Sequence, residues 1–186
     1  MSYLRRIAGY GIAAIGVAGT LFAQLPVPRP APQLSLTEPS GKSVSLAEYA
    51  GKVVLVQFLY TTCPHCQTTS RNFSSLQNEL GSSGLQVLGI AFNEEAEGNS
   101  VAVRTYVQSN GVTFPVGVAS RDAVLGYLGI PVMSRFVVPQ IMVIDRKGLV
   151  RAQTAPLGSD ELMDVARLRP MLEGLLKEAP RTSSSR

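Results

Sequence analysis

The sequence predicts an α/β fold, and two apolar runs with a helical segment between them support this prediction. Residues 53–60 (VVLVQFLY) and 85–92 (LQVLGIAF) are rich in apolar residues and are too short for typical helices, so each is expected to be a buried strand. Between the two runs, Cys66, Ser70 and Phe73 recur at helical spacing, which indicates a helix. A strand–helix–strand unit normally makes a right-handed crossover between parallel strands.

The remaining segments predict a hairpin near each end of the domain and further helices. Residues 34–46 carry alternating apolar residues around a Pro-Ser-Gly-Lys turn, which favours an N-terminal hairpin. Residues 141–153 predict a second hairpin, because two apolar segments flank the turn Asp-Arg-Lys-Gly. Helices are expected around residues 101–109, 122–127 and 159–177.

The composition indicates a single globular domain, which we place at residues 34–179. The chain has 186 residues, of which 45% are hydrophobic and 16% are charged, and this length suits one ordinary core. The formal net charge is +4, but no long run of Lys and Arg occurs. A nucleic-acid-binding protein needs a clustered basic face, so the sequence argues against this class.

Both ends of the chain are expected to lie outside the domain. Arg5 and Arg6 precede an uncharged, mostly apolar run, so residues 1–23 are predicted to be a signal peptide or an uncleaved membrane anchor. Four prolines fall within residues 25–32, which predicts a stiff linker over residues 24–33. Residues 180–186 are expected to be a disordered tail. Either reading of the leader places the domain outside the cytoplasm, in a bacterial periplasm, where disulfide chemistry is at home.

The residues best suited to chemistry are concentrated in one stretch, Cys63-Pro64-His65-Cys66. It contains both cysteines and the one histidine of the chain, at the start of the helix that follows the first buried strand. Free backbone N–H groups and the helix dipole favour a thiolate at Cys63, the attacking species. Pro64 suits the first helical turn, and His65 adds a donor. We expect Cys63 to attack a disulfide and Cys66, one turn further in, to resolve the mixed disulfide.

Other readings of these residues are less favourable. A zinc site normally needs four ligands, and a c-type haem needs His directly after the second cysteine, where Gln67 stands. A purely structural disulfide stays an alternative, although a bridge across two residues closes too small a loop to constrain the unfolded chain much. We therefore predict no metal and no cofactor other than a redox-active Cys63–Cys66 disulfide.

Three separated segments resemble the thioredoxin-like superfamily, and in particular its exported, AhpC/TSA-related TlpA/ResA-like branch. They are residues 34–66, the Val138-Pro139 step and the segment IMVIDRKGLV at residues 141–150. The resemblance implies a three-layer α/β/α sandwich with a mixed central sheet. It also implies that Pro139 is cis and faces the cysteines, and that the backbone of Val138 pairs with an extended substrate. The Pro-His dipeptide is like that of DsbA-type oxidants, which favours an oxidising or isomerising protein, whereas TlpA-like relatives are mostly reductants.

The sequence departs from the family pattern at several positions near the cysteines. Gln57 stands where thioredoxins have a buried Asp that handles the proton of the second cysteine, and an amide cannot titrate. Gln57 therefore joins Pro64 and His65 as a residue expected to tune the thiols. Thr62 replaces the usual Trp. The segment 129–138 is longer than usual and is either a surface loop or a site lining that carries Met133, Arg135 and Phe136.

The sequence thus predicts an exported, monomeric thiol–disulfide oxidoreductase that acts on protein thiols and works with a redox partner protein. Substrate contacts are expected at Thr62, Phe136, Val138 and Pro139. Two alternatives stay open. One is a non-catalytic thioredoxin-like binding or scaffold module. The other is a thiol peroxidase, which is disfavoured because Val56 and Tyr60 stand where peroxiredoxins carry Pro and Thr.

Overall fold

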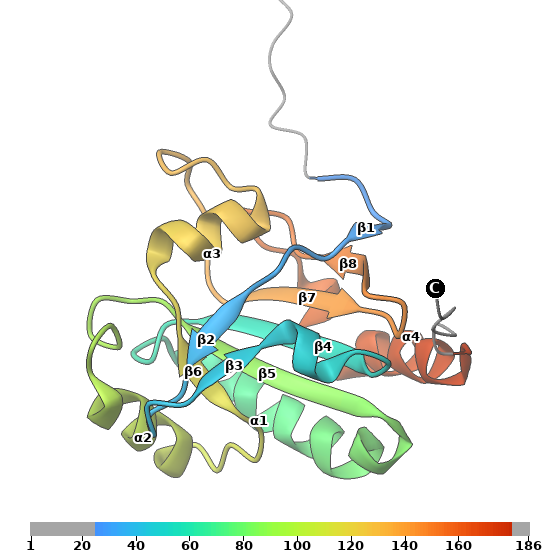
Figure 1. Cartoon of the computed structure of the whole chain (residues 1–186), viewed down its shortest axis with the longest axis horizontal. Coiled ribbons are helices and arrows are strands. Elements are labelled where there is room, and N and C mark those ends of the chain that lie inside the picture. Colours follow the sequence, from blue (N-terminus) through green and yellow to red (C-terminus); the bar gives the residue numbers. More distant parts are fainter. Residues whose placement is uncertain (1–24, 180–186) are drawn as a thin grey trace, which may run out of the picture.

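The computed structural model describes residues 25–179, and within them all strands belong to one mixed sheet (Figure 1). The strand order is β1-β8-β7-β4-β5-β6-β2-β3. The strands are β1 (Arg29–Pro30), β2 (Ser35–Thr37), β3 (Ser43–Ser45), β4 (Val53–Leu59), β5 (Leu85–Ala91), β6 (Val116–Val118), β7 (Gln140–Ile144) and β8 (Leu149–Gln153). The helices are η1 (Leu46–Tyr49), α1 (Pro64–Leu80), η2 (Gly81–Ser83), α2 (Ser100–Ser109), α3 (Arg121–Leu128), η3 (Asp160–Leu162) and α4 (Val165–Lys177).

The centre of the sheet is β4, whose seven residues are all buried. It pairs in parallel with β5 and antiparallel with β7, so that Gln57 lies between Gly89 and Ile141. The predicted crossover is confirmed, because α1 connects β4 to the parallel strand β5. The C-terminal end of β4 therefore leads directly to the start of α1, where the cysteines lie.

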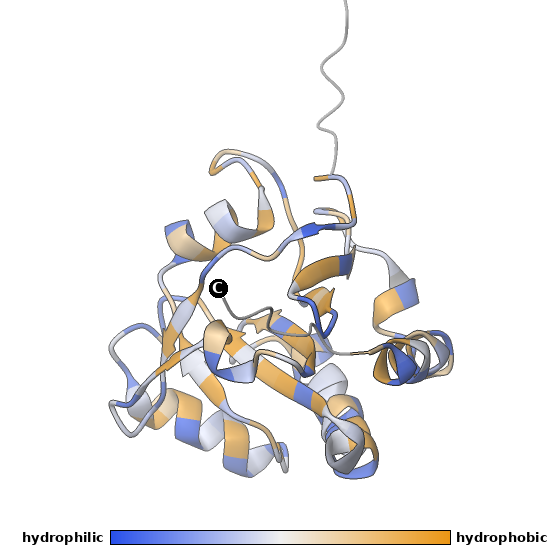
Figure 2. Ribbon diagram, turned by 45° about the vertical axis from the view of Figure 1, so that its right-hand side comes forward, coloured by the Kyte–Doolittle hydropathy of each residue, from blue (hydrophilic) through white to orange (hydrophobic). Residues whose placement is uncertain are grey.

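Helices cover both faces of the sheet, which confirms the predicted three-layer sandwich. Leu55 and Leu59 of β4 pack into a core with Phe73 of α1, and residues of α2 and α4 complete this core. Val56 and Phe58 point to the other face and form a second core with residues of α3. The hydropathy colouring in Figure 2 follows this arrangement, with hydrophobic residues along the central strands.

The N-terminal hairpin is confirmed as β2 and β3, which extend the sheet beyond β6. After it, Ser45 and Glu48 form a capping box that begins η1. At the opposite edge, the structure corrects the predicted linker. Arg29 and Pro30 pair with β8 as a short strand, so this part of the Pro-rich segment belongs to the sheet. Proline suits such an edge position, since a ladder N–H is not required on the open side.

The predicted leader (residues 1–23) and tail (180–186) lie outside the described residues. Among residues 25–179, no helix is both long and apolar enough to cross a membrane.

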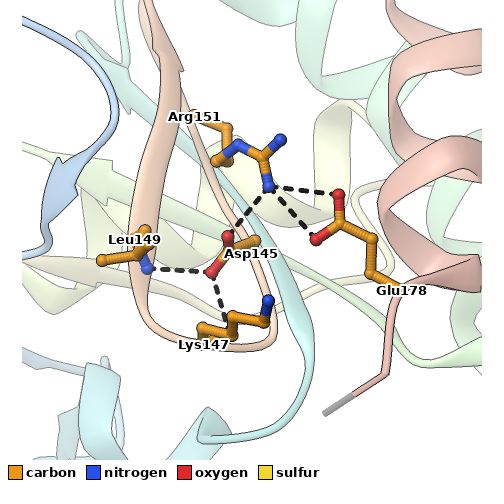
Figure 3. A network of polar contacts seen from close by, with 5 residues as sticks. All are labelled: Asp145, Lys147, Leu149, Arg151 and Glu178. Atoms are coloured by element: carbon orange, nitrogen blue, oxygen red, sulfur yellow. Dashed lines mark hydrogen bonds and ion pairs between the residues drawn. The ribbon is translucent and has the colours of Figure 1, made fainter. Parts of the chain in front are cut away.

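An ion pair with a buried carboxylate fixes the turn between β7 and β8 (Figure 3). The Asp145 carboxylate accepts the backbone N–H groups of Lys147 and Leu149 at 2.8 and 2.9 Å. Arg151 donates to Asp145 at 3.0 Å and to Glu178, just after α4, at 3.1 Å. Burial alone would raise the pKa of Asp145, but the hydrogen bonds from Leu149, Arg151 and Lys147 lower it overall. This network fastens the hairpin to the C-terminal end of α4.

Candidate functional site

The two cysteines occupy the first turn of α1, directly after the central strand. Cys63 is the N-cap of α1, and its sulfur accepts the backbone N–H of Cys66 at 3.3 Å. Pro64 is at the first helical position, as expected. The Cys63 N–H donates to the Tyr60 carbonyl at 3.1 Å and closes the turn between β4 and α1. The sequence forms this turn because a helix cap accepts orphan N–H groups and proline needs no partner for its nitrogen.

The two sulfurs differ in exposure. Cys63 is partly exposed, Cys66 is fully buried, and both are free thiols. Burial and the hydrogen bond to Cys63 raise the pKa of the Cys66 thiol well above its ordinary value. The Cys63 sulfur accepts a backbone N–H and lies at the N-terminus of α1, where the positive end of the helix dipole is found. The arrangement gives one accessible nucleophile backed by a protonated, buried partner.

The Val138–Pro139 step lies against the first cysteine. The peptide bond is cis, Pro139 is buried, and the Val138 carbonyl oxygen is 3.8 Å from the Cys63 sulfur. The predicted neighbours Cys63, Val138 and Pro139 are thus brought together, although they lie more than 70 residues apart in the chain.

A hydrogen-bond network lies beneath Cys66, and it contains Gln57 in a role that we did not expect. The Gln57 Nε2 donates to the Cys66 carbonyl oxygen at 2.8 Å. Its Oε1 accepts the Ser70 hydroxyl at 2.7 Å. Tyr106 of α2 lies 2.6 Å from the Ser70 hydroxyl and donates to the same Cys66 carbonyl at 3.1 Å. Gln57 therefore supports the backbone of the first helical turn, and neither of these two hydrogen bonds involves a sulfur.

Sequence reasoning missed Ser70 and Tyr106 as members of this site. Ser70 did fall on the helix face predicted to be buried, and a buried hydroxyl needs a partner, so its position was the one available signal. Burial raises the pKa of Tyr106, which keeps its phenol protonated and able to donate.

Comparisons with known proteins agree with this arrangement. Residues 27–153 match the AhpC/TSA family. The chain belongs to the AhpC/TSA family.

Curated and structural relatives place it more closely within that family. It is 24% identical over 155 residues to the thiol-disulfide oxidoreductase ResA of Bacillus thuringiensis, a match that covers 83% of this chain and 79% of that protein. A thiol:disulfide interchange protein from Chlorobium tepidum has a TM-score of 0.64 and 27% identity, covering 80% of this chain and 97% of the other. The thioredoxin domain of a thiol-disulfide oxidoreductase from Bacteroides vulgatus has a TM-score of 0.63 and 21% identity. This match covers 80% of this chain and 99% of the other. The predicted resemblance to TlpA/ResA-like, thioredoxin-fold proteins is confirmed.

The other predicted site residues of this AhpC/TSA domain are Thr62, His65 and Phe136, and they differ in exposure. Thr62 and His65 are exposed beside Cys63. Phe136, predicted to contact the substrate, has its ring stacked on Phe92 with centroids 6.0 Å apart, and Arg121 lies 5.5 Å from its ring. Half-buried against the α3-side core, Phe136 anchors the loop. Such packing needs an aromatic neighbour, Phe92, from the residue directly after β5, which the sequence around Phe136 cannot reveal.

The long loop has one very exposed apolar side chain, Met133, which is 95% accessible. Arg135 is exposed as well. Within residues 25–179, no cluster of three or more His, Cys, Asp and Glu side chains could hold a metal ion.

Proposed function

We propose that this AhpC/TSA-family protein is a thiol–disulfide oxidoreductase that exchanges disulfides with protein thiols through Cys63 and Cys66. The observation that carries the proposal is the asymmetry of the pair. Cys63 caps α1, is partly exposed and accepts the Cys66 N–H, whereas Cys66 is buried behind it with a raised pKa. The ResA relatives, which are named thiol-disulfide oxidoreductases, support this assignment.

The reaction proceeds through a mixed disulfide. The Cys63 thiolate attacks one sulfur of a substrate disulfide, and the other substrate sulfur leaves as a thiolate that takes up a proton. Cys66 then loses its proton and attacks the Cys63 sulfur, which breaks the mixed disulfide and releases the second substrate thiol. Two electrons pass from the cysteine pair to the substrate. The same steps in reverse oxidise a dithiol, and no further cofactor is needed.

The substrate is expected to approach along the cis-proline loop. The Val138 carbonyl lies 3.8 Å from the Cys63 sulfur, so an extended polypeptide that pairs with this backbone would bring its own sulfur to Cys63. Exposed Thr62 and His65 border the same sulfur along the chain. A redox partner protein that restores the pair would use the same surface. The basic, then apolar, N-terminus supports action outside the cytoplasm.

Cysteine variants test this function. Cys63→Ser should abolish reduction of insulin disulfides and oxidation of dithiols, because no accessible nucleophile is left. Cys66→Ser should instead accumulate mixed disulfides, detectable by mass spectrometry and released by dithiothreitol. A Cys63→Ser protein that keeps both activities would refute the proposal, and an inert wild-type disulfide would favour the scaffold alternative.

The direction of the reaction is set by the reduction potential of the pair. Pro64 and His65 lie in the first turn of α1, and Pro-His between the cysteines favours an oxidant. Equilibration of the cysteine pair with glutathione measures this potential. For a two-electron couple, a difference of about 30 mV corresponds to a free-energy difference of about 1.4 kcal/mol. A potential near that of thioredoxin, about −270 mV, would indicate a reductant.

A second candidate, thiol peroxidase, has one observation in its favour. The chain is 34% identical over 95 residues to a protein of Xenopus laevis named probable glutathione peroxidase 8-B, although this match spans 49% of this chain and 44% of that protein. Rapid consumption of hydrogen peroxide with a thiol donor would support peroxidase activity. Val56 and Tyr60 argue against it, because they replace the Pro and Thr of the peroxiredoxin pattern.

A further inference from the structure

A second buried glutamine, Gln140, lies directly after the cis-proline and is fully inaccessible to solvent. Its Nε2 donates to the carbonyl oxygens of Val137 at 2.8 Å, Pro156 at 3.1 Å and Ala155 at 3.3 Å. One side-chain amide therefore joins the loop that carries Val138 to the segment that follows β8.

Thr154 fixes the orientation of that amide. Its hydroxyl accepts the Ile141 N–H at 3.0 Å and donates to the Gln140 Oε1 at 2.8 Å. With its hydroxyl proton given to Oε1, the NH₂ group must face the three carbonyl oxygens. The opposite orientation would set an oxygen against these acceptors, which is unfavourable in a buried site. Thr154 is also fully buried, so both polar groups depend on each other.

The regular backbone pairing of β7 with β8 ends at Ile141 and Thr154, and side-chain hydrogen bonds replace part of it there. The Thr154 N–H still donates to the Ile141 carbonyl at 3.0 Å, but the Ile141 N–H is bonded to the Thr154 side chain. Beyond β8, the carbonyl oxygens of Ala155 and Pro156 accept hydrogen bonds from the Gln140 side chain. A direct backbone bond, Val137 N–H to Pro156 carbonyl at 2.9 Å, lies beside the amide. We call Gln140 and Thr154 together the amide clamp.

We propose that the amide clamp is a positioning device for polypeptide substrates: it holds the Val137–Val138 backbone in the place where an extended chain pairs with it beside Cys63. The inference rests on the proposed function and extends it to residues that touch neither sulfur. The clamp bonds the carbonyl of Val137, and the next carbonyl, that of Val138, lies 3.8 Å from the Cys63 sulfur. A shift of this loop therefore displaces the surface that a polypeptide must pair with. A small disulfide needs only the Cys63 sulfur.

The test compares two probes on the reduced protein. One is an unstructured peptide with a single cysteine, presented as its mixed disulfide with 2-mercaptoethanol, and the other is hydroxyethyl disulfide. Thr154→Val removes the hydroxyl and keeps the side-chain shape, whereas the matched control Thr154→Ser keeps the hydroxyl. Gln140→Met is a second, independent break of the clamp. The readout is the ratio of kcat/KM for the peptide to that for hydroxyethyl disulfide.

We expect this ratio to fall about tenfold in Thr154→Val and in Gln140→Met, the equivalent of about 1.4 kcal/mol, mainly through a higher KM for the peptide. Thr154→Ser should restore it to within about twofold of the wild-type ratio. The assay is run under conditions in which circular dichroism shows each variant to be folded, because an unfolded chain would expose both cysteine thiols and react with either probe.

Two results would overturn the positioning role. One is a ratio that stays at the wild-type value in both broken variants. The other is a fall in Thr154→Ser as large as in Thr154→Val. If the wild-type protein reacts with neither probe, the proposed function fails instead, so the two failures are distinguishable.

Discussion

Gln57 differs from the carboxylate that thioredoxins carry at this position in what it can do for Cys66. Its amide donates to the Cys66 carbonyl at 2.8 Å and accepts from Ser70, so it stabilises the turn that holds the resolving cysteine. It cannot accept the proton that the buried Cys66 thiol must lose. With the pKa of Cys66 raised by burial, deprotonation is expected to limit resolution near neutral pH.

Replacement of Gln57 by a titratable group of the same type as in thioredoxins tests this interpretation. Gln57→Asp should speed resolution by Cys66 and give it a new pH dependence, whereas Gln57→Asn, equal in size to Asp, should not. A carboxyl at this fully buried position has a raised pKa, so the variant should lose stability as pH rises through that value. Stopped-flow measurement of mixed-disulfide resolution from pH 5 to 9, with urea unfolding at each pH, gives both quantities. Equal kinetics for the Asp and Asn variants would argue against a proton role.

At the scale of the elements, the long apolar strands β4 and β5 were predictable, whereas the short strands β1 and β6 were not. β4 and β5 are seven-residue strands in which all but one residue is apolar or glycine, and burial on both faces produces this pattern. β1 has two residues, one of them proline, and β6 has three, so neither offers a period to detect. The same limit applies to the site. The spacing of Cys63 and Cys66 is local, whereas Tyr106 reaches the Cys66 carbonyl from 40 residues away.

The β7–β8 hairpin should depend on its buried carboxylate. Asp145→Asn removes the charge that accepts Arg151 and two backbone N–H groups, and loss of such bonds is expected to cost about 1–3 kcal/mol of unfolding free energy. Chemical denaturation of both proteins at pH 7 measures this difference.

The pH dependence of the wild-type protein provides the control. The pKa of Asp145 is lowered on folding, so its contribution is fully present above the ordinary value of 3.8 and disappears as pH falls through the lower, folded value. The stability difference between wild type and Asp145→Asn should therefore shrink as pH falls below 3.8. A difference that stays constant in acid would assign the loss to packing.

Across the whole molecule, the reactive end of the sheet and its N-terminal edge are separate regions. The cysteines follow the C-terminal end of β4, whereas the arm of residues 25–31 covers the β8 edge through β1. The Ala31 N–H donates to the Gly148 carbonyl at 2.9 Å, and Arg29 donates to Gln153 at 2.6 Å. Partial burial lowers the pKa of Arg29, because loss of solvent disfavours its charged form. The arm is thus attached to the domain as part of the sheet, through the pairing of β1 with β8.

Removal of the arm should weaken the fold and expose a sheet edge. A chain that begins at Gln33 lacks β1 and its hydrogen bonds. Loss of a few bonds of about 0.5–1.5 kcal/mol each should lower the unfolding free energy by about 2 kcal/mol. For a domain of this size, that corresponds to a fall in Tm of about 4–8 °C. The β8 edge would then be open to pairing with a second molecule, so size-exclusion chromatography should reveal association that rises with protein concentration. A chain that begins at Leu25 keeps the arm and serves as the control. If both chains melt at the same temperature and stay equally dispersed, β1 contributes nothing to stability, and residues 25–31 act only as the linker that their prolines predict.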